Sequence, residues 1–131
     1  MPPTPFGMID VEDTLTEEML AEVLKQDEAG DDLTDVHVFI FPEGIKVTAK
    51  FDVIIGIKQD ILAMGTFAVE NDNLVVKIQS IELEKVDVTQ LYKKKVESRV
   101  VTGVYKLLPR RYVQDFTLRN GEIVVYSKMR P

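Results

Sequence analysis

The chain has 131 residues, of which 45% are hydrophobic and 29% are charged, and its formal net charge is −6. A chain of this length and composition is typical of one globular domain that buries a core without disulfides or metal ions. It contains no cysteine, which excludes thiol chemistry and a disulfide framework. No apolar run approaches the ~20 residues of a membrane-spanning helix.

The charges are divided unevenly along the chain. Residues 1–90 hold 6 Lys and Arg against 19 Asp and Glu, whereas residues 91–131 hold 10 against 3. One interpretation is that the two parts attract each other in a fold whose charges are otherwise solvated. The other is a basic face for an anionic membrane surface or another acidic partner. Nucleic acid is not an expected partner, because the whole chain is acidic and has no basic-plus-aromatic recognition motif.

The first predicted elements are a lead segment and a short helix. Residues 1–13 are Pro-rich and then acidic, and we expect them to form a flexible lead. Thr14-Leu15-Thr16-Glu17 resembles a capping box, so a helix is predicted over about Thr16–Gln26. An acidic loop follows, whose carboxylates do not have the spacing of a calcium-binding EF-hand loop.

A series of strands is predicted next. The odd positions of Ile45–Lys58 are all apolar up to Ile57, and this alternation predicts one long strand with a buried face. Leu33–Phe41, Ile61–Glu70 and Leu74–Val86 complete a four-strand meander. The apolar row of the last strand slips by one position near Gln79-Ser80, which predicts a β-bulge.

A second helix and a hairpin close the chain. The helix begins near Asp87 or Thr89 and ends by Pro109; its apolar stripe consists of Tyr92, Val96, Val100, Val104 and Leu107 or Leu108. Asn120-Gly121 lies between the strand-like runs Tyr112–Arg119 and Glu122–Met129 and is a strong hairpin signal. The predicted fold is α+β over residues 14–131, with a short N-terminal helix, a long curved antiparallel sheet wrapped on the second helix, and a C-terminal β-hairpin.

Catalytic motifs are missing from the sequence. His37 is the only histidine and lies in a strand-like run, so we interpret it as structural. The chain has no His/Cys cluster for zinc, no Gly-rich phosphate loop and no nucleophile motif. We therefore expect no enzymatic activity, no metal and no cofactor. An enzyme of another kind would need carboxylates such as Asp52, Asp60 or Asp115 to converge in a pocket.

Small or flexible residues interrupt the bulky ones along the predicted sheet: Ala49, Gly56, Ala63, Met64, Gly65 and Ala68. Two interpretations remain open. Gly and Ala could let the second helix pack closely or mark bends in the strands. Alternatively, small residues on long curved strands could leave a groove or tube for an apolar ligand.

The order of elements resembles a known family. A helix of the type Leu15–Leu20, long antiparallel strands, a long helix and a hairpin of the type Val113–Val125 resemble small bacterial lipid-binding domains of the tubular lipid-binding superfamily, which include LmeA-like phospholipid-binding proteins and related envelope lipoproteins. The resemblance implies a curved sheet around a helix and a lipid-accessible cavity. Members usually carry a signal or anchor, which is not recognisable here, so both the cell envelope and the cytoplasm stay open as locations.

Our leading hypothesis is non-enzymatic binding of a lipid or other apolar molecule between the curved sheet and the second helix. The expected ligand-binding residues are Val47, Ala49, Phe51, Val53, Ile55, Met64, Phe67, Val100 and Val104. The residues expected to contact a membrane or head group are Lys93, Lys94, Lys95, Arg110 and Arg111. The alternative is a protein-interaction or homo-oligomeric scaffold domain with an ordinary packed core, and a homodimer would also complete a tube.

Overall fold

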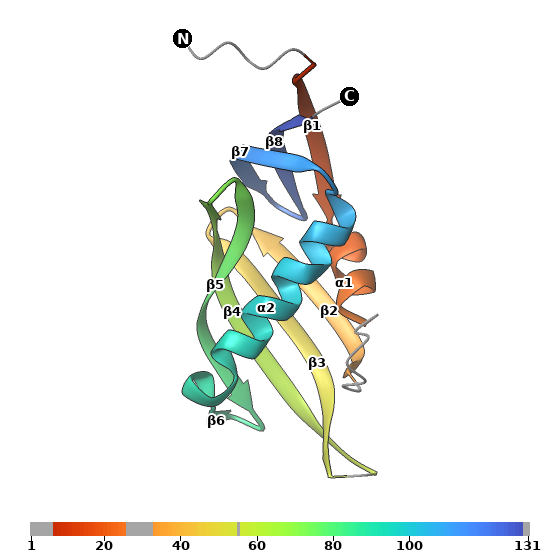
Figure 1. Cartoon of the computed structure of the whole chain (residues 1–131). Coiled ribbons are helices and arrows are strands. Elements are labelled where there is room, and N and C mark those ends of the chain that lie inside the picture. The colour runs from red at the N-terminus through yellow and green to blue at the C-terminus, as the bar shows by residue number, and fades with distance from the viewer. Residues whose placement is uncertain (1–6, 26–32, 55, 130–131) are drawn as a thin grey trace.

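The computed structural model describes residues 7–25, 33–54 and 56–129, with the backbone alone for residues 52–54. Over these residues the fold is α+β with antiparallel strands and two helices, as predicted, and its strands form two sheets (Figure 1). The elements in chain order are β1 (Ile9–Thr16), α1 (Glu17–Lys25), β2 (Leu33–Phe41), β3 (Gly44–Ile54), β4 (Ile57–Glu70), β5 (Asn73–Leu83), β6 (Val86–Asp87), α2 (Thr89–Leu107), β7 (Arg111–Arg119) and β8 (Glu122–Met129).

Five strands form the larger sheet in the order β2-β3-β4-β5-β6. The single strand expected over Ile45–Lys58 is wrong: Gly56 has φ +85°, β3 ends at Ile54, and β4 begins at Ile57. A residue without a Cβ takes this left-handed backbone at little cost, so the chain reverses there rather than at Gln59-Asp60. The bulge is confirmed, because Ser80 faces Met64 while Ile78 faces Gly65, which leaves Gln79 unpaired in the register.

The smaller sheet brings together the two ends of the described chain in the order β1-β8-β7. The predicted hairpin is confirmed, with Gly121 at φ +87° in the turn between β7 and β8. Residues 9–13 are not a flexible lead, because they belong to β1 and pair with residues 125–129 of β8. This strand was missed because its inward position 13 is an aspartate, which interrupts the apolar row formed by Ile9, Val11 and Leu15.

Helix α1 begins at Glu17, two residues later than a capping box with Thr14 as the N-cap requires. The Met19 N–H donates to Thr16 Oγ1 at 3.2 Å, so Thr16 is the capping residue and Thr14 remains in β1. Glu17 does not reach back to the helix start. Its carboxylate instead accepts a hydrogen bond from Ile40 N in β2 at 2.7 Å.

Helix α2 lies diagonally across one face of the larger sheet, as Figure 1 shows, and packs most closely on β5. The core between the layers contains its buried residues Val100, Gly103 and Val104. Gly103 is where α2 meets α1: a Cβ at this position would lie 2.7 Å from Val23 Cγ2. The glycine therefore permits a close approach of the two helices at the C-terminal half of α2.

Side chains from the helices pair with main-chain groups at both edges of the larger sheet. On β2, Glu17 of α1 accepts a hydrogen bond from Ile40 N, as described above. On β5, Glu97 of α2 accepts from Ile78 N at 2.7 Å, and Thr89 Oγ1 accepts from Ile81 N at 2.9 Å. Unpaired strand N–H groups would otherwise offer a template to another chain. In the described part of the chain, no helix is long and apolar enough to cross a membrane.

Candidate functional site

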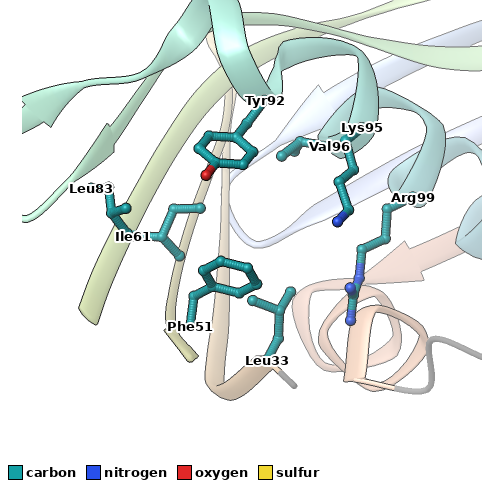
Figure 2. Close-up of a pocket in the computed structure, with 8 residues that line it drawn as sticks. All are labelled: Leu33, Phe51, Ile61, Leu83, Tyr92, Lys95, Val96 and Arg99. Carbon is teal, nitrogen blue, oxygen red and sulfur yellow. The ribbon is translucent and has the colours of Figure 1, made fainter. Parts of the chain in front are cut away.

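An apolar cavity lies between the N-terminal half of α2 and the larger sheet. Figure 2 shows its lining, with side chains from α2 on one side and from the strands on the other. The lining residues are Leu33, Phe51, Ile61, Leu83, Tyr92, Lys95, Val96 and Arg99. Two of these are basic, six have apolar or aromatic side chains, and none is acidic. The cavity therefore combines a hydrophobic wall with positive charge at one side.

Two aromatic rings shape the wall of the cavity. Phe51 of β3 and Tyr92 of α2 have centroids 6.5 Å apart and rings inclined by 66°, an edge-to-face contact between helix and sheet. Tyr92 and Val96 are only partly buried, whereas Val100 and Val104, one and two turns further on, are fully buried. The first half of α2 thus covers the sheet less tightly than the second half.

The basic side of the cavity is tied to α1. Arg99 donates from Nε and Nη2 to the Leu24 carbonyl oxygen, at 3.1 and 2.6 Å, near the C-terminal end of α1. Carbonyls at the end of a helix lack intrahelical donors and attract positive charge. This contact fixes the guanidinium at the cavity and holds α2 to α1.

The cavity volume is about 50 Å³. Pockets that enclose drug-sized ligands are larger, typically ~300–1,000 Å³. The cavity holds at most a small apolar group unless α2 moves away from β3 and β4. Its lining is nevertheless apolar, and a dry apolar cavity is a place where hydrocarbon is favoured over water.

The predicted ligand-binding residues are not all brought together. Phe51 lines the cavity, whereas Ala49, Phe67, Val100 and Val104 are buried in the close-packed core and Val47 packs against it. Met64 lies on the opposite face of the sheet and is 44% exposed. The Val53 side chain and Ile55 lie outside the described residues. Lys95, which was predicted as a head-group contact, also lines the cavity. The lining residues that the prediction missed are Leu33, Ile61, Leu83, Tyr92, Val96 and Arg99.

The predicted basic residues are also in different environments. Lys93, Lys94, Lys95 and Arg110 are exposed. Arg111 is not available to a head group, because its Nε lies 2.9 Å from Asp13 Oδ2 and the two side chains are only 17% and 24% exposed. Arg111 therefore connects β7 to β1, which is a structural role.

The outer face of the larger sheet has a different character. It carries Phe39, Phe41 and Met64, each at least 40% exposed, and the Lys46 Nζ lies 5.4 Å from the Phe39 ring centroid. Nearby is a hollow of about 490 Å³ lined by charges of both signs; its lining includes His37, Lys46, Lys50, Asp60, Glu82 and Glu84. An open hollow with these charges favours water over hydrocarbon, so the cavity under α2 is the better candidate site for an apolar ligand.

The residues considered for other chemistry are dispersed. Asp60 belongs to the larger sheet and Asp115 to the smaller one, while the side chain of Asp52 is outside the described part. Of the acidic residues around the start of β2, Asp35 belongs to β2, and residues 27–32 lie outside the described part. Within the described ranges, no three His, Cys, Asp or Glu side chains are grouped so that they could hold a metal ion.

No known family model matches this chain, and no curated protein matches its sequence. The function is therefore argued from the geometry of the site.

Proposed function

We propose that this domain binds an apolar ligand, such as the acyl chain of a lipid, between α2 and the larger sheet without changing it chemically. The observation that supports this proposal is the apolar cavity under the N-terminal half of α2, with Lys95 and Arg99 at its border. Apolar walls would hold the hydrocarbon part, and the basic side chains would favour ligands whose polar end is anionic.

Binding requires the cavity to grow. The C-terminal half of α2 is held by buried packing, while Tyr92 and Val96 are only partly buried. We propose that the first half of α2 moves off β3 and β4, so that the sheet curves around both the helix and the ligand. This is the arrangement implied by the resemblance to the tubular lipid-binding domains. A ligand that binds only the opened state would shift the population toward it.

The first experiment is native mass spectrometry of the purified protein, followed by organic extraction and lipid analysis. An added mass that disappears on extraction supports the proposal and identifies the ligand. A fluorescent fatty acid, dansyl-undecanoate, then measures binding to the extracted protein. We expect its emission to rise and shift to the blue on entering an apolar site.

A variant that fills the cavity gives the specific test. Val96→Phe places a ring in the cavity and should reduce dansyl-undecanoate binding about tenfold or more, because the space is small. Thr102→Phe adds a ring to an exposed position of the same helix and is the matched control. Equal binding by the wild type and Val96→Phe, with both folded, would reject this site.

A second function, protein interaction, is favoured by the outer sheet face, where Phe39, Phe41 and Met64 are exposed together. We propose it as the alternative if the protein carries no extractable ligand and does not bind the probe. Light scattering of the wild type and of Phe39→Ser tests its self-association form, because a dimer through this face should dissociate in the variant.

A further inference from the structure

The outward face of α2 differs from the rest of the molecular surface. Leu91 and Tyr105 are the most exposed large hydrophobic residues in the described part, at 78% and 65%. They are 14 residues apart, which is roughly four helical turns, so they lie on nearly the same side of the helix about 21 Å apart. Figure 1 shows no element in front of this side of α2.

The charged residues that α2 itself places on the same face are all basic. Lys94 and Lys95 lie near Leu91, and Lys106 lies beside Tyr105, whereas Lys93 lies on the Val100 side of the helix by its spacing. Glu97 is the only acidic residue of α2, and its carboxylate is turned to the sheet edge, where it accepts from Ile78 N. The residues that α2 itself contributes to this face thus include no acidic side chain, on a chain whose net charge is −6.

We infer that this face, defined by Leu91, Lys94, Lys95, Tyr105 and Lys106, docks on an anionic lipid surface. A helix lying in the plane of a membrane interface buries apolar side chains and keeps basic ones among the head groups. Tyrosine suits this boundary because its ring is apolar and its hydroxyl is polar. The two apolar side chains are spread along a convex helix, and a flat lipid surface can contact both at once.

The inference goes beyond ligand binding in the cavity and does not depend on it. The two are adjacent, because Lys95 belongs to this face and also lines the cavity. Docking would place the cavity beside the lipid surface. A failure of vesicle binding would leave the dansyl-undecanoate result unchanged, because that probe is measured without vesicles.

Co-sedimentation of the whole chain with phosphatidylglycerol vesicles tests the docking. We expect binding to these vesicles, little binding to phosphatidylcholine vesicles, and loss of binding at high salt. Lys94→Glu should weaken binding by at least roughly fivefold, because one lysine near an anionic surface contributes about that factor. Leu91→Ser together with Tyr105→Ser should weaken it further in the same assay.

Matched variants separate this face from net charge and from general hydrophobicity. Lys93→Glu makes the same charge change on the other side of α2, and Phe39→Ser removes an exposed aromatic side chain from the outer sheet face. Both should bind the vesicles nearly as the wild type does. The inference is overturned if the wild type does not bind, if Lys93→Glu loses as much as Lys94→Glu, or if the face mediates only self-association seen by light scattering.

Discussion

The two halves of α2 meet the rest of the molecule in different ways. The C-terminal half is packed: Val100 and Val104 are buried, and Gly103 brings the backbone close to Val23 of α1. The N-terminal half covers a cavity, and hydrogen bonds hold its start. Thr89 Oγ1 accepts from Ile81 N of β5 and donates to the Asp87 carboxylate. One regular helix is therefore fixed at one end by buried apolar side chains and held at the other by hydrogen bonds and partly buried side chains.

The difference teaches that helical periodicity does not determine packing density. Tyr92, Val96, Val100 and Val104 follow one another at intervals of four, yet only the last two are fully buried. What decides the density is the opposing surface, which sequence spacing does not describe. A half-helix whose apolar side chains are only partly buried can also separate from its sheet at lower energy than a fully packed half can.

The largest expected effect comes from filling the packed half. Gly103→Leu should lower the free energy of unfolding by about 3 kcal/mol, because even a Cβ at this position lies within 2.7 Å of Val23 Cγ2. Ser98→Leu adds the same side chain to the exposed side of α2 and should change stability by less than about 0.5 kcal/mol. Urea denaturation of both variants measures the difference. Similar losses of unfolding free energy in the two variants would show that α2 is not closely packed against α1 at Gly103.

A smaller effect is expected from removing side-chain volume in each half. Val100→Ala should destabilise the protein by about 2 kcal/mol, since two buried methyl groups are lost and a void remains. Val96→Ala should lower stability by less than about 1 kcal/mol, because Val96 is partly exposed and already borders a cavity. Urea denaturation measures both losses of unfolding free energy. A larger loss in Val96→Ala than in Val100→Ala would contradict the proposed difference between the two halves.

The smallest effect concerns the polar start of α2. Hydrogen bonds from the Thr89 hydroxyl and then from the Thr89 N–H lower the pKa of Asp87 below its ordinary value of 3.8. The native pKa is the lower one, so the stabilisation is complete above the ordinary value and is lost as the pH falls through the native pKa. Asp87→Asn should therefore lower the thermal midpoint slightly at neutral pH.

The check is the thermal midpoint of the wild type and of Asp87→Asn between neutral pH and pH near 3. The gap between them should narrow below pH about 4, as the wild-type carboxylate takes up a proton. A gap that stays constant over this range would show that the Asp87 charge does not contribute.

Much of the fold could be predicted from local signals. Apolar alternation predicted the strand Leu33–Phe41, and β2 has these bounds. Turn chemistry predicted the hairpin around Asn120-Gly121, and β7 and β8 pair across this turn. The strand β1 could not be predicted, because Asp13 occupies an inward position that only the distant Arg111 makes acceptable. The end of β3 was missed because apolar alternation continues across the turn at Gly56.

The candidate site could be predicted only as a region. The space between the second helix and the sheet was expected, and two of the named residues line it: Phe51, predicted to bind the ligand, and Lys95, predicted to contact a head group. Ala49 and Phe67 were chosen because they lie on long alternating strands interrupted by small residues, but both are buried in packed core. Whether two apolar surfaces leave a void depends on sub-ångström fit between distant segments, and composition does not encode this fit.

The smaller sheet has a consequence for the order in which the protein forms during synthesis. Strand β1 pairs with β8, so Thr16 cannot pair with Glu122 until Glu122 has been synthesised and has left the ribosome. At ~5–20 residues per second, this delay is roughly 5–20 s on the ribosome. During that time the meander β2–β5 can pair locally, while β1 stays without its neighbour. Pairings this distant in sequence also slow refolding, so the smaller sheet should be the last part to acquire protection against hydrogen exchange.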